Sequence, residues 1–296
     1  MRKPRVLVAA ALAFALAFTG CTSDPEKPDP SKSATQTQGA SYKLGILAPA
    51  TTHGWVAGVA FYAEQRAKEL SSELEYRVAT ANNAEEMTAQ LDDLLTWGAN
   101  AIVAFPQWEG MEMPIQQAID KGVVVVNFDI EIKANGVYRV SGDNKDMGVQ
   151  GAHYIFDAVG AGATIVQLNV PSAGSVSELR QAGFEETYAT LDPTVNIKTY
   201  ATKFTREDGL KDMTDILTAN PHIDAVYSMD DETSIGVLQA LKEAGRTDVK
   251  VVTGGGGCQE YFNMMKEDDS ILIQSALYSP MMVMDAVDMA LAVLKG

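Results

Sequence analysis

The sequence is poor in cysteine and histidine, the residues that most often build disulfides, metal centres and nucleophilic sites. Its 296 residues contain two cysteines and three histidines, and the histidines, at positions 53, 153 and 222, lack metal-ligand spacing. It also lacks a Gly-x-Ser-x-Gly elbow, a Walker loop and a zinc-binding helix motif. These absences weaken the case for an enzyme without excluding one, and we expect neither a metal nor a cofactor.

Positive charge is scarce as well. The chain has 23 Lys and Arg against 39 Asp and Glu, which gives a formal net charge of −16. Such an acidic protein is repelled by nucleic acid and by anionic lipid surfaces, so the composition argues against a DNA-binding role. With 46% hydrophobic and 21% charged residues the composition is globular, and the length allows two domains of ordinary size.

The N-terminus has the pattern of a targeting segment rather than of a folded element. A basic start, from Arg2 to Arg5, precedes an apolar run over residues 6–18 that is short for a membrane span. The following Phe18-Thr19-Gly20-Cys21 resembles a bacterial lipobox, in which the cysteine is lipidated and becomes the mature N-terminus. We therefore expect residues 1–20 to be a lipoprotein signal peptide and Cys21 to carry a lipid. An ordinary secretory signal and a single spanning helix are the alternatives.

The next segment is predicted to be a flexible tether over residues 21–41. It is rich in Ser, Thr, Pro, Gln and Asp, a composition that cannot bury a core. The tether would leave the folded part outside the cytoplasm and anchored to the membrane. If Cys21 carries a lipid, Cys258 has no partner cysteine, and the exported fold holds without an internal disulfide.

Past the tether, strand patterns and helix patterns alternate. The valine run before Asp129 is too short and too β-branched for a surface helix, and it is typical of a strand buried on both faces. Asn83 is predicted to cap a helix, with Glu86 completing a capping box. The other strands are expected at 43–48, 74–78, 101–105, 137–141, 163–168, 195–200, 225–228, 249–252 and 271–276, with helices between them and a last helix over 280–294.

This alternation predicts an α/β fold with parallel sheets covered on both faces. The elements form two similar series, which divide near Ser141-Gly142-Asp143. In open α/β sheets, ligands bind outside the carboxyl ends of the strands, so the residues that follow each strand are the first candidates for a site.

Asp129 ends the valine run and is the leading candidate. A carboxylate there can accept hydrogen bonds from a polar ligand, although it could instead cap a local turn. Other strand ends carry Trp55, Trp108 and the pair Asp230-Asp231, of which one is expected to cap the helix that follows and to leave the other free. Aromatic rings that cover C–H faces, together with acids that pair with hydroxyls, suit a sugar. Each aromatic could equally be a half-buried loop residue.

Two further features have open interpretations. Gly254 to Gly257 follows a strand and precedes a helix, so it could bind phosphate, but a close backbone approach to another ligand fits the spacing better. Cys258 could be a reactive thiol or a small packed side chain. Arg180 lies in the first turns of a predicted helix, where a surface ion pair is the default expectation.

Taken together, these residues resemble the ribose-type periplasmic binding proteins, the solute receptors of bacterial sugar ABC importers. The resemblance covers nearly everything from Tyr42 to Gly296. The segments that carry it are KLGILAPATTHGW, WGANAIVAFP, VVVVNFD, SGDNKDMG, ELRQAGF, FTREDG, DAVYSMDDETSIGVLQALKEAG and DVKVVTG. The predicted lipobox and tether are also similar to those of membrane-anchored receptors of this kind.

The resemblance implies two flavodoxin-like lobes joined by a hinge, the type I fold of periplasmic binding proteins, that close over a sugar. We expect residues 42–141 plus 277–296 to form the N-terminal lobe and residues 142–276 the C-terminal lobe. Asp129 and Arg180 would then bond ligand hydroxyls or the ring oxygen, while Trp55 and Phe204 would stack on the ligand. The remaining candidate ligand-binding residues are His53, Trp108, Asp230, Gly255 and Tyr278.

The sequence departs from the family pattern in three places. The family usually has an aromatic-Asp pair where this chain has Gly254-Gly255, and commonly a Gln where it has Leu277-Tyr278. Family members usually continue past the last helix and cross the hinge again, so we expect either two crossings here or a longer natural chain. The departures argue against assuming that the solute is ribose.

We therefore expect a monomeric, extracytoplasmic receptor that does no chemistry and delivers a monosaccharide to a membrane permease. The first alternative is a receptor of the same fold for a non-sugar solute, such as a polyol, a cyclitol, a nucleoside or a furanosyl signal. A two-lobe transcription regulator would need an N-terminal helix-turn-helix, where this chain has the lipobox and tether. A Rossmann-type enzyme would need a bound cofactor.

Overall fold

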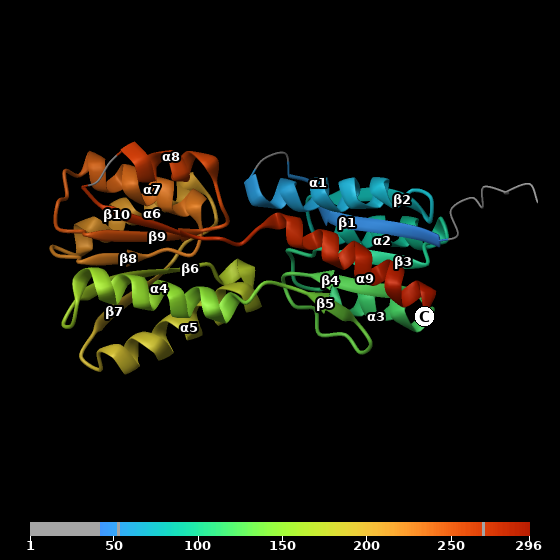
Figure 1. Ribbon diagram of the computed structural model, residues 1–296, viewed down its shortest axis with the longest axis horizontal. Coiled ribbons are helices and arrows are strands. Elements are labelled where there is room, and N and C mark those ends of the chain that lie inside the picture. Colours follow the sequence, from blue (N-terminus) through green and yellow to red (C-terminus); the bar gives the residue numbers. More distant parts are fainter. Residues whose placement is uncertain (1–41, 52–53, 268–269) are drawn as a thin grey trace, which may run out of the picture. The chain divides into compact units, whose positions relative to one another are not determined.

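The computed structural model describes residues 42–51, 54–267 and 270–296, which contain two parallel five-stranded sheets (Figure 1). The predicted signal peptide, the tether, Cys21 and His53 lie outside the described residues. The expected α/β class with two parallel sheets is confirmed.

The first sheet has the strand order β2-β1-β3-β4-β5, and each neighbouring pair is parallel. Strand β1 (Tyr42–Pro49) lies between β2 and β3, so its Ile46 lies opposite Val78 on one side and Val103 on the other. This order follows from right-handed crossovers, which place successive strands first on one side of β1 and then on the other. The remaining strands are β2 (Leu74–Ala81), β3 (Ala101–Ala104), β4 (Val124–Phe128) and β5 (Tyr138–Val140).

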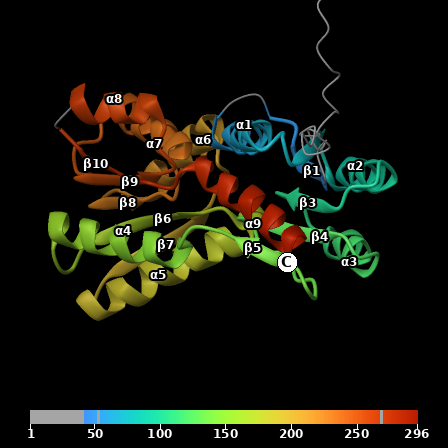
Figure 2. The same ribbon diagram turned by 45° about the vertical axis from the view of Figure 1, so that its right-hand side comes forward.

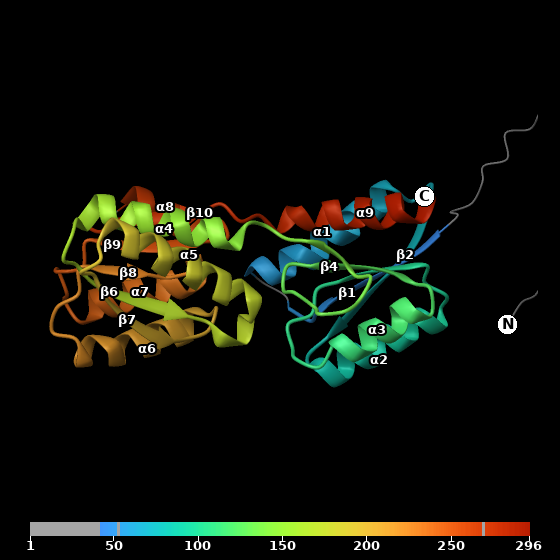
Figure 3. The ribbon, with the colours of Figure 1, turned by 90° about the horizontal axis from the view of Figure 1, so that it is seen from below.

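Helices cover both faces of the first sheet (Figure 3). One face packs on α1 (Gly54–Glu69) and α9 (Val283–Lys295), and the other on α2 (Ala84–Thr96) and α3 (Glu112–Asp120). Successive β4 residues pack against opposite helix layers, because strand side chains alternate between faces. Val125 packs toward α2 and α3, and Val126 toward α1 and α9. This is why the hydrophobic residues of the strand face both layers, with the buried Asn127 as its one polar residue.

The second sheet repeats the arrangement, with the order β10-β9-β8-β6-β7. Helices α4 and α5 cover one face, and α6, α7 and α8 cover the other (Figure 1). The strands are β6 (Thr164–Asn169), β7 (Asn196–Ala201), β8 (Ala225–Tyr227), β9 (Val251–Gly255) and β10 (Leu272–Ala276). The helices are α4 (Asn144–Val159), α5 (Ser175–Leu191), α6 (Arg206–Ala219), α7 (Asp231–Glu243) and α8 (Gln259–Glu267), with a short 3-10 turn, η1 (Pro171–Ala173), before α5.

The last helix belongs to the first lobe, although the strand before it belongs to the second. After β10 the chain passes through the 3-10 turn η2 (Pro280–Met282) into α9, which lies along β3 and β4 (Figures 1 and 2). Within the described residues the chain therefore passes between the two sheets twice, at 141–143 and at 277–279.

Two local expectations need correction. Asn83 does accept the Glu86 N–H at 2.8 Å, but the Glu86 carboxylate returns to the N–H and side-chain amide of Asn82 rather than to Asn83. The predicted strand at 249–252 begins later and continues through Gly254 and Gly255. These glycines pair in register with Ser275 and Ala276 of β10, because ladder hydrogen bonds need only the backbone.

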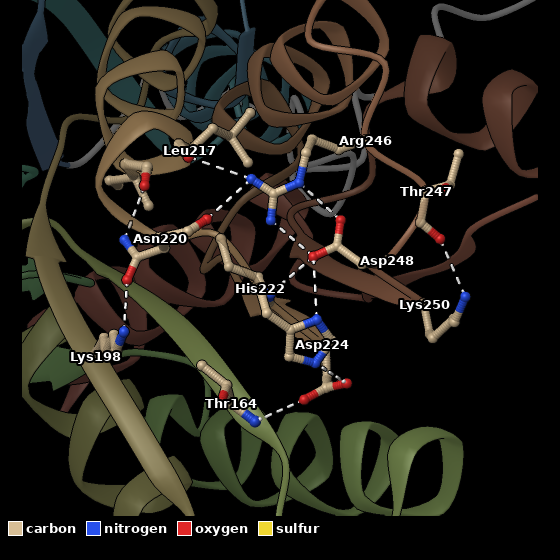
Figure 4. A network of polar contacts seen from close by, with 12 residues as sticks. Thr164, Lys198, Leu217, Asn220, His222, Asp224, Arg246, Thr247, Asp248 and Lys250 are labelled. Atoms are coloured by element: carbon tan, nitrogen blue, oxygen red, sulfur yellow. Dashed lines mark hydrogen bonds and ion pairs between the residues drawn. The ribbon is translucent and has the colours of Figure 1, made fainter.

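A polar cluster ties together the loops at the amino-terminal edge of the second sheet (Figure 4). The Arg246 guanidinium makes two bonds to the Asp248 carboxylate, at 2.8 and 2.7 Å, and the pKa of that carboxyl is held well below its usual range. His222 lies between Asp224, at 3.0 Å, and Asp248, at 3.5 Å. Asp224 in turn accepts the Thr164 N–H at the start of β6. This cluster lies at the sheet edge opposite the strand ends expected to bind ligand, and we regard it as structural.

Candidate functional site

Asp129 follows β4 directly and has an unusual backbone conformation. Its φ of 63° is the only positive value among the non-glycine residues that the structure describes. Its N–H donates to Val140 O at 2.9 Å, and its carbonyl accepts two bonds from the Arg139 guanidinium, the shorter at 2.7 Å. A strained residue persists only where its surroundings fix it, and such residues gather at functional sites. The carboxylate, with 4% of the residue exposed, is thus aimed by its backbone rather than by a local cap.

Tyr278 is the direct partner of Asp129. Its hydroxyl donates to the Asp129 carboxylate and accepts from Asn144 Nδ2 at 3.0 Å and from the Gly142 N–H at 3.2 Å. Its backbone carbonyl accepts the Trp55 indole N–H at 2.7 Å. One side chain therefore joins the end of β4, both inter-lobe segments and the start of α4.

Arg180 lies on α5 and is 5% exposed, so the default expectation of a surface ion pair is wrong. Its Nε donates to Asn144 Oδ1 and its Nη1 to Met229 O, both at 2.8 Å. Its guanidinium carbon lies 4.8 Å from the Tyr278 ring centre and 5.9 Å from that of Phe204. A buried cation that lies over two aromatic rings is positioned to meet a ligand oxygen in a dry environment.

The position of Arg180 depends on a close crossing of α4 and α5. A Cβ at Gly148 would overlap Arg180 O, and a Cβ at Gly183 would overlap Lys145 O. Two glycines thus let the helix backbones touch, which presses the N-terminal half of α5 against the start of α4. The contact explains why Asn144 and Arg180, 36 residues apart in the chain, are hydrogen-bonded.

The electrostatics of the three groups are coupled. Burial raises the pKa of Asp129, against the opposing effects of the Tyr278 hydroxyl and the Arg180 cation. Burial and the neighbouring Asp129 together raise the pKa of Tyr278 to about 12, so its hydroxyl stays protonated and remains a donor. Because the Tyr278 hydroxyl stays protonated, it continues to donate a hydrogen bond to the Asp129 carboxylate, in addition to the attraction of the Arg180 cation.

Asp230 and Asp231 divide the roles expected of them, but neither is left free. Asp230 caps α7, accepting from the N–H groups of Glu232 and Thr233 at 3.2 and 3.1 Å. The residue is partly exposed, and burial of its carboxyl raises its pKa to about 7 in spite of the nearby Arg180. Asp231 is buried and points to the other side, toward the glycine-rich loop.

The glycine-rich loop holds this carboxylate instead of a phosphate. One Asp231 oxygen accepts from the N–H groups of Gly257 and Cys258, at 3.0 and 2.7 Å, and from Ser275 Oγ at 2.9 Å. The other oxygen is buried with no hydrogen-bond partner among the described residues, and burial raises the pKa of the group. Because the loop donors are already occupied by an internal anion, the phosphate-binding interpretation is disfavoured.

The aromatic candidates separate into two groups. Trp55 packs against Phe105, Phe128 and Tyr278, with ring centres 5.7, 6.0 and 5.7 Å away, and so lies beside Asp129. Trp108 packs instead with the α2 and α3 side of the first lobe, in the cluster that includes Met111 and Ile132, and no described contact links it to Asp129 or Arg180. The structure thus brings together Trp55, Asp129, Arg180, Phe204, Asp230 and Tyr278, and leaves Trp108 apart.

Sequence patterns missed two features of this region. Asn144 bridges Arg180 and Tyr278 and is 1% exposed; its only sequence signal was an amide at a helix start directly after the inter-lobe segment. The second is a direct contact between the lobes, where Ile130 packs on Val170, Ala173 and Val176. Beside it, the Glu131 N–H donates to Ser175 Oγ at 3.0 Å.

Two negative findings apply to residues 42–51, 54–267 and 270–296. No group of three or more His, Cys, Asp or Glu side chains there is arranged to hold a metal ion. No helix in the same ranges is both long and apolar enough to cross a bilayer.

The fold and the buried polar group between its two sheets define a two-lobe α/β protein of the binding-protein type. A family model described as periplasmic binding protein domain matches residues 44–296, and the chain belongs to that family. The expected resemblance to ribose-type sugar-binding proteins of ABC importers is confirmed.

Individual relatives agree. The chain is 30% identical over 163 residues to the D-allose-binding periplasmic protein of Escherichia coli, and 28% identical over 193 residues to a xylitol-binding protein of Mycolicibacterium smegmatis. These alignments cover 52% and 64% of this chain, and about half of each relative, 52% and 55%. A solved ABC transporter solute-binding protein from Mycobacterium smegmatis with bound glycerol is 27% identical, with a TM-score of 0.77, and the match covers 87% of this chain and 89% of that one.

Proposed function

We propose that this protein is the extracytoplasmic solute-binding protein of an ABC importer and that it binds a monosaccharide or a polyol between its two lobes. The observation that carries the proposal is the buried group of Asp129, Arg180 and Tyr278, which draws on both lobes and both inter-lobe segments. A solute that contacts this group favours the arrangement in which the lobes meet.

The chemistry of the group suits a neutral polar solute. Arg180 can donate to a ring or hydroxyl oxygen, Asp129 and Asp230 can accept from hydroxyls, and Trp55 and Phe204 offer flat apolar faces. A micromolar receptor needs about −8 kcal/mol in total, which a few charge-assisted bonds and one stacked face can supply. A set of this kind needs no covalent step, so we propose no catalytic activity and no cofactor.

Several finer features are part of the same proposal. The lobes would comprise residues 42–141 plus 277–296 and residues 142–276, with His53, Trp108 and Gly255 as further ligand-binding candidates. Cys21 would carry the lipid that holds a monomeric receptor at the membrane beside its permease. The lipobox pattern supports the anchor, and mass spectrometry of the N-terminal peptide from membrane fractions tests it.

A polyol is the second candidate solute. The departures at Gly255 and Tyr278 from the ribose pattern favour it, as does the relative named as a xylitol-binding protein. A sugar and a polyol place hydroxyls at similar spacing, so one screen tests both.

The decisive experiment is a thermal-shift screen of residues 41–296 against sugars and polyols, because a ligand of the native state raises the melting temperature. We expect at least one compound to raise it in the wild type and to have no effect on Asp129→Ala or Arg180→Ala. Asp157→Ala, which removes an exposed carboxylate on α4, is the matched control and should respond like the wild type. A normal response in both site variants would contradict the site, and no response of the wild type to any compound would contradict the function.

A further inference from the structure

Ile130 comes two residues after β4 and packs on both halves of the molecule. On one side its side chain contacts the apolar core between the first sheet and helices α1 and α9. On the other side it contacts three buried residues around η1 and the start of α5, which are Val170, Ala173 and Val176. Next to this contact the Glu131 N–H donates to Ser175 Oγ at 3.0 Å. Both contacts join protein atoms to protein atoms, so they are the same whichever solute is bound.

The first lobe holds Ile130 in a fixed position. Asn127, the one polar residue of β4, is fully buried. Its side-chain amide donates to Ile130 O at 2.8 Å, and its side-chain oxygen accepts the Ile132 N–H at 2.9 Å. The positive φ of Asp129, 63°, turns the chain at the same point. Because all of these contacts lie within the first lobe, the position of Ile130 does not depend on the second.

The surface that receives Ile130 is likewise fixed from within its own lobe. The Val170 N–H donates to Ser177 Oγ at 3.0 Å, and the Ala173 N–H donates to Val170 O at 2.9 Å. Gly174 has a φ of 47°, which lets the chain pass directly from η1 into α5. Two apolar surfaces that are already fixed gain free energy from the area they bury and lose little conformational freedom when they meet.

From this geometry we infer that the Ile130 contact is a latch, which stabilises the closed arrangement of the lobes equally for every solute and so sets affinity without setting preference. The inference rests on the proposed function, in which the lobes close over a solute. The measured affinity for any solute includes the equilibrium constant for closure, so a contact made only between closed lobes enters every affinity as the same factor. Asp129 and Arg180, which would meet the solute itself, should instead affect different solutes by different factors.

Isothermal titration with three or more solutes from the screen tests the latch. Ile130→Ala should weaken the binding of each solute by about tenfold, and the factor should agree among solutes within about twofold. Stopped-flow measurements should assign the loss to faster dissociation, because the latch breaks when the lobes open. Ile119→Ala is the matched control, since it makes the same truncation at a partly buried residue of α3 in the first lobe and should leave every affinity unchanged.

A crosslink tests the contact independently of affinity. The pair Ile130→Cys and Ala173→Cys places two thiols in one contact cluster, in a protein whose two native cysteines are replaced by serine. Oxidation with copper phenanthroline should join them in an intramolecular disulfide, seen as a mobility shift on a non-reducing gel. Bound solute should accelerate the reaction, because it favours the closed lobes. The pair Ile119→Cys and Ala173→Cys, whose residues share no contact cluster, should not crosslink.

The outcomes separate the latch from the function on which it rests. Unchanged affinities in Ile130→Ala, or losses that differ among solutes, overturn the latch and leave the proposed function standing. Absence of the crosslink, both with and without solute, also overturns the latch alone, and this result holds even if Ile130→Ala does not fold. Failure of the wild type to bind any solute rejects the proposed function and the latch together.

Discussion

Three buried residues, Asp129, Tyr278 and Arg180, show how one charged group is kept available in a protein interior. Each would be costly alone, because burial of an unpaired charge or polar atom is unfavourable. Together they satisfy one another: the phenol donates to the carboxylate, and Asn144 links the phenol to the guanidinium. The positive φ of Asp129 is maintained by the Arg139 and Val140 contacts on its backbone.

Asp230 makes stability depend on pH. Its pKa is raised to about 7 in the folded protein, whereas the pKa of an unfolded aspartate is about 3.9. The folded state therefore binds more protons between these values, and the free energy of unfolding should fall as pH rises through that window. Denaturant titrations of the unliganded protein at pH 4 to 8 measure this effect.

Asp230→Asn isolates the contribution of this residue, because asparagine is an equally good helix cap and cannot ionise. The free energy of unfolding of the variant, relative to that of the wild type, should increase as pH rises from about 4 to 7. Asp129 and Asp231, whose pKa values are also raised, contribute the same sign in both proteins, so the difference reports Asp230 together with its repulsion from Asp231. A difference that does not change with pH would contradict the assigned cause.

At the scale of the elements, close helix crossings place the site. The α4–α5 pair touches through Gly148 and Gly183, and α6–α7 touches in the same way through Gly209 and Gly236. These crossings fix where the helix starts lie, and the helix starts carry Asn144 and Arg180.

Gly183→Ala tests the crossing by the sign of its effect. In an ordinary helix the substitution stabilises by about 0.5–1 kcal/mol, because alanine has the higher helix propensity. Here the new Cβ would overlap the Lys145 carbonyl, a backbone atom that cannot rotate away, so we expect a loss of about 1–3 kcal/mol. Urea unfolding measures it, and a gain in stability would show that the helices separate freely.

At the scale of the whole molecule, the first lobe is not formed by one continuous stretch of the chain. The first lobe is completed by α9, whose Val283, Ala286, Val287, Ala290 and Leu291 are buried in the core of that lobe. Helix α9 follows the strands of the second sheet in the sequence, so the last part of the first core comes from the end of the chain.

Truncation after Ser279 tests this dependence. Removing α9 exposes the apolar face of β3 and β4, and we expect the first lobe to lose its cooperative unfolding transition and the protein to aggregate. Truncation after Leu294 removes only Lys295 and Gly296 and should leave the melting temperature within a few degrees of the wild type. Calorimetry compares the two, and an unchanged transition in the longer truncation would show that α9 is dispensable.

The sequence by itself determined the class of fold, since alternating strand and helix periods, continuous valine runs and helix caps are local properties. It also placed Asp129, Trp55, Phe204, Asp230 and Tyr278 at strand ends or beside them, because parallel strands bring those ends to one edge. Only the tertiary structure decided that Arg180 is buried, that Trp108 lies elsewhere, that Asp231 fills the glycine-rich loop and that Tyr278 faces Asp129 across 149 residues. Those facts depend on where helices cross and where the chain returns between the lobes, and neither is encoded in any single stretch of residues.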